Sequence, residues 1–429
     1  ESNRYSIPVV SISLDEEHFF EYENGIYVAG KDFDDWRTNN PDGNALWSDA
    51  NYKRSGDETE KKAHFSFFKN GNEIINQNIG LRINGGFTRI SPNKSLRLYA
   101  RSEYGSSTFN HTFFENSSYS SFKRLILRNS GNDLSSTYFR DAFIQRTVNH
   151  LNFDTQAYQP TITFLNGEYW GILNMRERFD RHYFERVYNI ADGDLDFLEY
   201  NGFLVQEGDF EHYAAMLNFI ESNNLNNVAN FNYVTTQMDT ENYADHFIAN
   251  IYARNTDWPH NNIEFWRKRT EQYEPDAPHG QDGRWRWVLK DTDFGFGGDG
   301  GPQSYEHNTL AFATSTGGDE TTNPEWSTLI LRKLLENTTF KNNFINRFAD
   351  LMNTTYLPER VVGIINEMKS GVEAEIIEHG QRWNSINSLE FWNSNIDVMI
   401  EFSNERPIHQ RNHILEKFEI ESTLGVQLD

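Results

Sequence analysis

The order of two residue patterns along the chain constrains its fold more than any other feature. Short β-type runs fill the first hundred residues: IPVVSISL, GIYVAG, AHFSFF, GLRING and KSLRLYA. Asn, Asp and Gly residues separate these runs, as in the turns of an antiparallel sheet. The polar segment 32–57 is rich in Asn and Asp and is expected to form a long surface excursion. The amino-terminal part is therefore predicted to be β-rich.

Strand and helix patterns mix in the middle of the chain, and helical spacing dominates its end. STYFRDAFIQRTVNHL has apolar residues at helical spacing from Phe139 to Leu151, with Ser and Thr residues that predict a cap. AYQPTITFLNGEYWGILNMRE predicts a β-hairpin that turns at Asn166 and Gly167, and RHYFERVYNI predicts a short helix. NIEFWRKR and RWRWVLKD predict strands, and LILRKLLEN, FKNNFINRFADLM and ERVVGIINEMKSGVEAEIIEH predict helices. The fold class is thus α+β, with a β-rich amino-terminal lobe and a helix-rich carboxy-terminal lobe.

Composition excludes several classes of function. The 429 residues exceed one ordinary domain, and the 15% of aromatic residues predict a core built on Phe, Tyr and Trp. A net charge of −24 disfavours binding to nucleic acid or anionic lipid, and no apolar run is long enough for membrane insertion. The absence of cysteine excludes disulfides, thiolate zinc sites and a cysteine nucleophile. The sequence starts without Met, so we expect a processed chain that is soluble and secreted or on the cell surface.

Two aspartates lie where a predicted strand meets a glycine-rich loop, in LKDTDFGFGGDGG. Asp291 and Asp293 come just after RWRWVL, separated from it by Lys290, and four glycines come before residue 301. Carboxylates at the end of a strand, followed by glycines, can hold a hard cation that bridges phosphates. The alternative is a turn in which Asp and Gly merely terminate the strand.

A second candidate loop lies upstream, in RNTDWPHNN. Asp257 and Asn262 are five residues apart, which is the separation of the catalytic Asp and the metal-binding Asn in protein kinases. There the Asp accepts the proton of the substrate hydroxyl, and the Asn oxygen holds magnesium. An Asp before Trp and Pro also makes an ordinary turn. The order of this loop, two strands and Asp293 matches the order in kinases.

A third candidate is the basic segment INGGFTRISPNKSLRLYA. A kinase site requires a lysine on a strand, paired with a glutamate, to hold phosphates. Lys94 opens a strand-like run, and Arg89 and Arg97 could add phosphate contacts. The kinase glycine loop and the V-A-I-K motif are missing, and a hairpin with basic residues on its wet face is the alternative.

These blocks together resemble the spore-coat protein H (CotH-like) kinase family, whose members are atypical secreted or surface kinases. The resemblance lies in six blocks that come in the family's order, from about residue 80 to at least residue 350. The blocks are GLRINGGFTRISPNKSLRLYA, LRNSGNDLSSTYFRDAF, FLNGEYWGILNMRERFDRHYF, NTDWPHNNIEFWRK, WRWVLKDTDFGFG and FKNNFINRFADLM.

The resemblance implies a two-lobed, atypical protein-kinase-like fold with its site in a cleft between the lobes. Residues 1–80 would extend the amino-terminal lobe, residues 81–180 would form its core, and residues 181–429 would form the helix-rich carboxy-terminal lobe. ATP and Mg²⁺ would be the cofactors, with Mn²⁺ or Ca²⁺ as alternatives to Mg²⁺. The partner would be a protein substrate with Ser or Thr hydroxyls.

The resemblance also assigns a role to each candidate residue. Lys94 resembles the phosphate-contacting lysine, and Glu177 resembles the glutamate that orients it. Asp257 resembles the catalytic aspartate. Asn262 and Asp293 resemble the metal ligands, with Asp291 as a neighbouring ligand.

Two departures from the family pattern affect the site. Lys290 stands before Asp291 where the family usually has Trp-Asp-x-Asp, so it could weaken cation binding or touch a phosphate itself. The segment 270–283 also spaces the two motifs widely.

Other candidate metal sites are disfavoured. ADGDLDFLE places Asp192, Asp194 and Asp196 at alternate positions, which suggests calcium. It lacks the Gly at loop position six and the correctly placed final Glu of an EF-hand, so a helix-capping turn is preferred. The thirteen histidines show no HExxH motif or other paired spacing.

The sequence leaves two main hypotheses. One is an ATP- and Mg²⁺-dependent kinase that acts on Ser or Thr of a surface or exported protein. The other is a non-catalytic kinase-like adhesin or assembly scaffold. Retention of all five chemical types at Lys94, Glu177, Asp257, Asn262 and Asp293 favours the enzyme. Glycan recognition through exposed aromatic residues is a weaker third reading.

Overall fold

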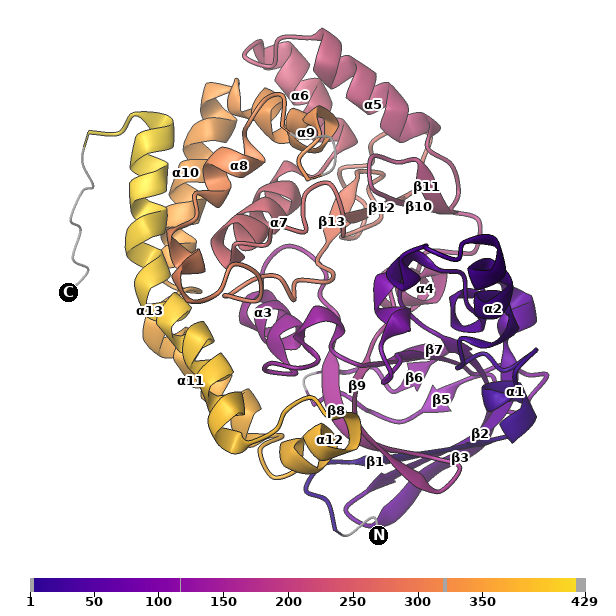
Figure 1. Ribbon diagram of the computed structural model, residues 1–429. Helices are drawn as coiled ribbons and strands as arrows, with labels where there is room; N and C mark the ends of the chain where they lie inside the picture. Colours follow the sequence, from indigo (N-terminus) through magenta and orange to yellow (C-terminus); the bar gives the residue numbers. More distant parts are fainter. Residues whose placement is uncertain (1–3, 116, 319–321, 422–429) are drawn as a thin grey trace. The chain divides into compact units, whose positions relative to one another are not determined.

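Four of the five β-type runs of the amino-terminal part contribute strands to a closed sheet in the computed structural model, which describes residues 4–115, 117–318 and 322–421 (Figure 1). The chain divides into two units. Unit 1 comprises residues 1–138, 157–178 and 368–393, and unit 2 comprises residues 139–156, 179–367 and 394–429. The fold is α+β, as predicted, with a large antiparallel sheet.

The closed sheet of unit 1 has the strand order β1-β2-β3-β4-β7-β9-β8. Its neighbours are antiparallel except β1 and β8, which pair in parallel and close the sheet. The strands are β1 (Val9–Leu14), β2 (Lys61–Lys69), β3 (Asn72–Ile83), β4 (Leu96–Tyr99), β7 (Arg124–Arg128), β8 (Tyr158–Leu165) and β9 (Glu168–Arg176).

Alternate residues of these strands fill the core of unit 1. Leu96 and Leu98 of β4 are buried in it, whereas Arg97 between them is only partly buried, as the period of two in a strand requires. Phe65 and Phe109 pack edge to face at 5.4 Å, one of several aromatic pairs in this core. The predicted aromatic core is therefore confirmed.

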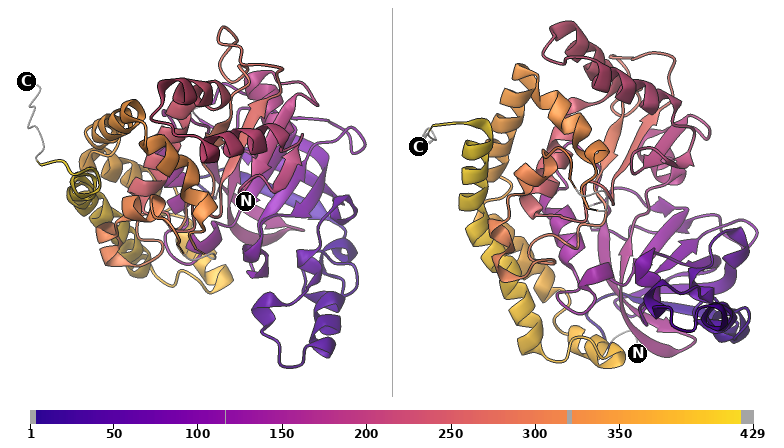
Figure 2. Two further views of the ribbon diagram at one scale, coloured as in Figure 1. Left: turned by 90° about the horizontal axis from the view of Figure 1, so that it is seen from above. Right: turned by 45° about the horizontal axis from the view of Figure 1, so that its top comes forward.

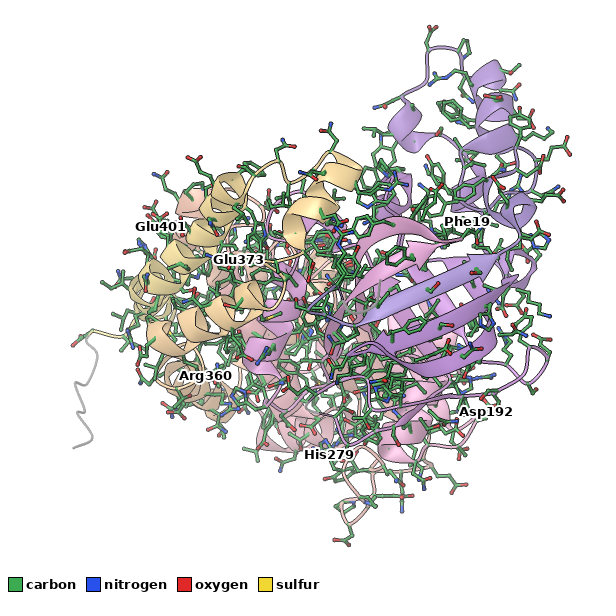
Figure 3. The ribbon with its side chains drawn as sticks, turned by 90° about the horizontal axis from the view of Figure 1, so that it is seen from below. Phe19, Asp192, His279, Arg360, Glu373 and Glu401 are labelled. Carbon is green, nitrogen blue, oxygen red and sulfur yellow. The ribbon has the colours of Figure 1, made fainter. Side chains whose placement is uncertain are left out.

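Short elements cover unit 1. Phe19, the buried residue of α1, belongs to the core and can be located in Figure 3. These elements are α1 (Glu16–Phe20), α2 (Gly30–Asn39), η1 (Ala45–Trp47), η2 (Asn51–Lys53), η3 (Asp57–Thr59), η4 (Phe87–Ile90), β5 (Phe109–Asn110), β6 (Ser121–Phe122), η5 (Gly131–Asp133) and α12 (Ile376–Trp383).

Helix α12 packs on β9 at a glycine. The imidazole Nδ1 of His379 accepts a hydrogen bond from the amide of Ile172 at 2.9 Å. Gly171 has φ +90°, and a Cβ there would lie 2.5 Å from the same imidazole nitrogen. Only glycine satisfies both this backbone conformation and the close approach of α12.

Unit 2 combines a four-stranded antiparallel sheet with helices. The strand order is β11-β10-β12-β13. Its strands are β10 (Leu195–Glu199), β11 (Leu204–Glu207), β12 (Glu264–Lys268) and β13 (Arg286–Val288). Its other elements are α3 (Arg140–Val148), α4 (Arg181–Tyr188), α5 (Glu211–Ser222), α6 (Val228–Gln237), α7 (Thr240–Ala253), η6 (Pro302–Glu306), α8 (Thr309–Ala313), α9 (Glu325–Leu335) and α10 (Thr338–Met352). Helices α11 (Pro358–Ser370) and α13 (Leu389–Phe418) have residues in both units.

Helix α13 contributes one fully buried guanidinium to unit 2. Arg406 donates to the carbonyl oxygens of Ile251 and Tyr252 at the end of α7, and to those of Tyr305 and His307. The same helix runs along α10 (Figures 1 and 2), where rings of the two helices lie 6.4 Å apart. Buried charge of this kind is tolerated because its donors are satisfied.

Several local predictions are confirmed. The hairpin β8–β9 turns at Asn166 and Gly167, whose φ angles of 49° and 83° are those of a type I′ turn. Helix α4 and strands β12 and β13 lie where the sequence predicted them. The long helix α13, interrupted in sequence by Pro407, was not predicted.

Other local predictions are wrong. GIYVAG is not a strand: Ile26 and Tyr27 donate their amides to carbonyl oxygens of residues 18 and 19, and the segment packs as a loop. The polar segment 32–57 is mostly exposed, as predicted for a surface excursion, but it also contains helical turns and the buried Asn51. Helix α3 has no Ser or Thr cap, because Ser136 and Thr137 donate their hydroxyls to Asp133.

Asp192 and Asp196 of ADGDLDFLE form ion pairs with arginines and do not cap a helix. Asp192 forms an ion pair with Arg181 at 3.2 Å. Asp196 lies in β10, fully buried, and forms ion pairs with Arg267 and Arg269 at 2.8 Å each. Two guanidinium groups therefore neutralise the buried carboxylate of Asp196.

Candidate active site

The pairing of β12 with β13 brings two distant loops to one end of a sheet. Glu264 pairs with Val288, and Trp266 pairs with Arg286, in antiparallel register. The residues before β12 and the residues after β13 therefore leave the sheet at the same end. We name these two segments after their predicted roles: residues 254–262 are the catalytic loop, and residues 289–301 are the metal loop.

Helix α7 and a buried tryptophan fix the catalytic loop. Trp258 is fully buried, and its ring meets that of Phe247 in α7 at 4.5 Å. Next to it, Asp257 accepts hydrogen bonds from the side-chain amides of Asn261 at 3.1 Å and Asn262 at 2.8 Å. The structure thus joins Asp257 and Asn262 by a direct hydrogen bond within one short loop.

The electrostatics of Asp257 connect the two loops. Burial raises the pKa of Asp257, and the negative charge of Asp291 raises it further. Hydrogen bonds from Asn261 and Asn262 and the proximity of His260 act in the opposite direction. Asp257 is therefore a better proton acceptor than an exposed carboxylate, and a cation beside Asp291 would relieve the repulsion between the two carboxylates.

Close backbone contacts hold the metal loop against the end of α7. The amide of Phe296 donates to the carbonyl oxygen of Ala253 at 2.8 Å. Gly295 lies close to Ala253: a Cβ added to Gly295 would be 3.0 Å from the carbonyl oxygen of Ala253. Within the loop Asp293 is buried, and Asp291 has a positive φ of 50°. The glycine of Asp-Phe-Gly is thus required for space.

An ion pair connects the metal loop to the catalytic loop. Arg254 directly follows α7 with φ 58°, and its guanidinium lies 2.9 Å from the carboxylate of Asp299. The same nitrogen donates to the carbonyl oxygen of Asp299 at 2.6 Å. Sequence reasoning missed this pair, because 45 residues separate its members and neither stands in a kinase motif.

The oxygen donors of the two loops suit a hard cation. Asp257, Asp291 and Asp293 offer carboxylates and Asn262 an amide, the ligand types that Mg²⁺ takes together with several waters. In the described part of the chain no three His, Asp or Glu side chains gather into a preformed metal cluster. The amide nitrogen of Asn262 faces Asp257, so its oxygen is the atom available to a cation.

Lys290 pairs with two glutamates of the sheet. Its ammonium forms an ion pair with Glu264 of β12 and lies 3.7 Å from Glu199 of β10. Burial opposes the charge on Lys290, but the two glutamates outweigh it and raise its pKa. Burial also raises the pKa of Glu264, to about 7. In this structure the lysine that departs from the family pattern neutralises glutamates of the sheet.

In unit 1 Lys94 is buried just before β4. Its Nζ donates to the carbonyl oxygens of Arg89 at 2.6 Å and Ser91 at 2.8 Å, rather than to Glu177, and lies 4.1 Å from the ring centre of Tyr52. Burial lowers the pKa of Lys94 to about 7. Glu177, buried after β9, accepts a hydrogen bond from the amide of Ala157 at 3.3 Å.

The two candidate arginines differ in what they bind. Arg97 donates to the side-chain oxygen of Asn84 at 2.5 Å, and burial, with nearby Arg178 and Arg89, lowers its pKa to about 10. Arg89 donates to the carbonyl oxygen of Gly85 and to three carbonyl oxygens of residues 52–54. Arg97 is thus a partly buried cation beside a neutral amide, whereas Arg89 anchors the polar excursion.

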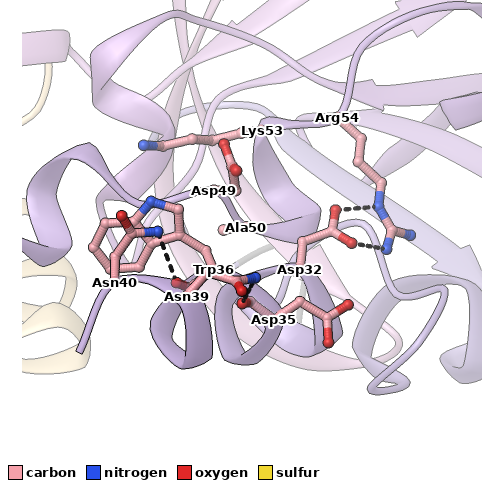
Figure 4. A pocket seen from close by; sticks show the side chains of 9 residues that line it. All are labelled: Asp32, Asp35, Trp36, Asn39, Asn40, Asp49, Ala50, Lys53 and Arg54. Atoms are coloured by element: carbon pink, nitrogen blue, oxygen red, sulfur yellow. Dashed lines mark hydrogen bonds and ion pairs between the residues drawn. The ribbon is translucent and has the colours of Figure 1, made fainter. Parts of the chain in front are cut away.

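A pocket of about 440 Å³ opens in the polar excursion of unit 1 (Figure 4). Asp32 and Arg54 form a two-point ion pair at its wall, with both contacts at 2.7 Å. None of the predicted site residues lines it. The lining residues are Asp32, Asp35, Trp36, Asn39, Asn40, Asp49, Ala50, Lys53 and Arg54.

Comparison with known families agrees with the resemblance of the sequence motifs. The family model described as CotH kinase protein matches residues 81–409, which is most of the chain. The protein belongs to the CotH kinase family, and this membership associates it with kinase-type chemistry. In a separate search, no curated protein matched the sequence. Every helix in the described residues is too short or too polar to cross a bilayer.

Proposed function

We propose that this protein is an ATP- and Mg²⁺-dependent kinase that phosphorylates Ser or Thr of a surface or exported protein. The observation that carries the proposal is the β12–β13 register, which brings a carboxylate–asparagine loop and a two-aspartate loop to the same end of one sheet. Family membership supports kinase-type chemistry. A two-lobed kinase-like arrangement, with unit 1 as the amino-terminal lobe, is part of the proposal.

Each residue of unit 2 has a distinct task in this mechanism. Asp257 orients the acceptor hydroxyl and accepts its proton, for which its raised pKa suits it. Asp291, Asp293 and Asn262 would hold Mg²⁺, which when bound neutralises charge on the phosphates. Phosphoryl transfer needs positioning and charge neutralisation rather than covalent help from the protein.

In unit 1, Lys94 and Arg97 would hold the phosphates. Burial lowers the pKa values of Lys94 and Arg97, to about 7 and about 10. An anionic phosphate would relieve this cost of buried charge, because opposite charge favours the protonated form. Arg89 is a weaker candidate, since Gly85 and residues 52–54 engage its donors. Glu177 would orient Lys94 only after Lys94 leaves its carbonyl partners.

The test combines binding with transfer. ATP is titrated by calorimetry with and without Mg²⁺, and labelled phosphate is followed into the protein itself and into a Ser/Thr-rich protein mixture. Transfer that requires Mg²⁺ supports the enzyme. Binding of ATP without transfer to any acceptor would instead favour the non-catalytic scaffold, and absence of ATP binding would refute the nucleotide site.

A further inference from the structure

The start of helix α3 contacts the metal loop through two consecutive charged residues. Asp141 is buried, and its Oδ1 accepts hydrogen bonds from the amide of Thr292 at 2.8 Å and from the Thr292 hydroxyl at 3.0 Å. Its neighbour Arg140 donates to the carbonyl oxygen of Phe296 at 2.5 Å. One end of a helix therefore holds the metal loop on both sides of Asp293.

Apolar contacts from α3 reinforce the two polar ones. The ring of Phe143 meets that of Phe296 edge to face, with centroids 5.0 Å apart. Ile144 lies so close to Gly295 that an added Cβ would be 2.8 Å from its Cδ1. The metal loop is thus packed against α3 as well as hydrogen-bonded to it.

The contact between Asp141 and Thr292 is buried, so each polar group in it needs its partner. Thr292 is 0% exposed and Asp141 is 4% exposed. A buried carboxylate is costly unless donors satisfy it, and Gln145 supplies a further hydrogen bond at 2.9 Å. The bond to the Thr292 amide orients the peptide between Asp291 and Thr292, and the bond to the hydroxyl anchors the side chain that lies between the two aspartates.

We propose that Asp141 and Arg140 are positioning residues that hold Asp291 and Asp293 in the geometry that binds the cation. The proposal rests on the proposed function, since it assigns the role of these residues toward that same site. Outer partners that orient metal ligands commonly change metal affinity by about 10- to 100-fold when they are removed. Arg140 and Asp141 thus link α3 to the metal loop, and Asp141 and its partner Thr292 are 151 residues apart in the sequence.

The test removes one hydroxyl and keeps the fold. In the full chain, Thr292→Val should raise the Mg²⁺ concentration needed for half-maximal ATP binding by about 10-fold, and Thr292→Ser should stay near wild type. Asp141→Asn should act in the same direction. The double variant Asp141→Asn/Thr292→Val should be no worse than the more affected single variant, because the two residues make one contact.

Thr147→Val is the matched control. Thr147 is a buried threonine of the same helix, and its hydroxyl donates within α3 to the carbonyl oxygen of Phe143. It should change thermal stability without changing the Mg²⁺ requirement. An equal Mg²⁺ requirement in Thr292→Val and Thr147→Val would overturn the positioning role.

Hydrogen exchange separates this proposal from the proposed function. If the wild type binds no ATP with Mg²⁺, the proposed function fails, and exchange in the metal-free protein then decides the positioning role. Faster exchange of residues 290–297 in Thr292→Val and Asp141→Asn than in Thr147→Val supports it. Equal exchange in all three variants refutes it.

Discussion

The surroundings of Asp257 in the folded chain determine its pKa. Its burial, its two asparagine partners and the neighbouring Asp291 set its pKa, and none of these depends on a bound nucleotide. Its task in the proposed reaction concerns the acceptor hydroxyl alone. A substitution of Asp257 should therefore change the rate of phosphoryl transfer without changing nucleotide affinity.

Asp257→Asn should lower phosphoryl transfer by about 10²-fold or more while ATP affinity stays near wild type, because the amide cannot accept the proton. Labelled-phosphate incorporation and calorimetric ATP titration measure the two quantities on the same preparation. Unchanged transfer would remove Asp257 from the mechanism. Loss of ATP affinity would show that the substitution disturbs the loop instead.

Lys94 allows a test that needs no substrate. Its pKa in the folded protein is about 7, well below the ordinary value of 10.5, so between these pH values the unfolded chain holds a proton that the folded chain has lost. The free energy of unfolding should therefore rise with pH across this window, by up to about 1.4 kcal/mol per pH unit from this group.

Urea unfolding at pH 7 and pH 9.5 checks this linkage. Lys94→Met should remove most of the rise between the two pH values. Lys62→Met, at an exposed lysine of β2, serves as the control and should leave the rise intact. A rise of equal size in Lys94→Met and wild type would mean that other groups cause it.

At the scale of elements, two glycines of the β8–β9 hairpin distinguish packing from backbone strain. Gly167 and Gly171 have similar φ angles of 83° and 90°. A Cβ at Gly167 meets nothing within 4 Å, whereas a Cβ at Gly171 would lie 2.5 Å from the imidazole of His379 in α12. Only the second position adds a steric clash to the strain.

Gly171→Ala should therefore lower the free energy of unfolding by about 1–3 kcal/mol more than Gly167→Ala, since overpacking adds to the backbone cost. Denaturant unfolding of both variants gives the difference directly. Equal losses in the two variants would show that α12 shifts away freely from β9.

At the scale of the whole molecule, bound ligand should stabilise the fold. Mg²⁺ and ATP together at about 100 times their dissociation constant should add about 2.7 kcal/mol to the free energy of unfolding, and chelation of Mg²⁺ should remove it. Asp293→Ala should abolish this stabilisation, because the cation loses its main charged ligand. Asp291→Ala should weaken it less.

Thermal unfolding with ATP, with and without EDTA, measures this effect for each variant. Stabilisation by ATP that EDTA leaves unchanged would argue against a metal-dependent nucleotide site. Equal and negligible effects of both substitutions would return the metal loop to the alternative of a simple turn.

Part of this molecule follows from short stretches of sequence. Alternation predicted strands β1, β2, β3 and β4, and Asn166–Gly167 predicted the hairpin turn, because these depend on side-chain period and local backbone preference. The spacing of Asp257 and Asn262 placed both residues in one short loop, but their hydrogen bond to each other was not predicted. Their roles, and those of Asp291 and Asp293, remain predictions.

Tertiary structure alone decided which partners the buried charges take. Asp141 accepts a hydrogen bond from Thr292, which is 151 residues away in the sequence. Asp196 forms ion pairs with two arginines, and Lys290 forms one with Glu264 of β12. It also made GIYVAG, a strand by pattern, into a loop whose Ile26 and Tyr27 belong to the core of unit 1. The physical reason is that a buried polar group must be satisfied by whichever donor or acceptor the folded chain brings near, and local spacing does not specify that partner.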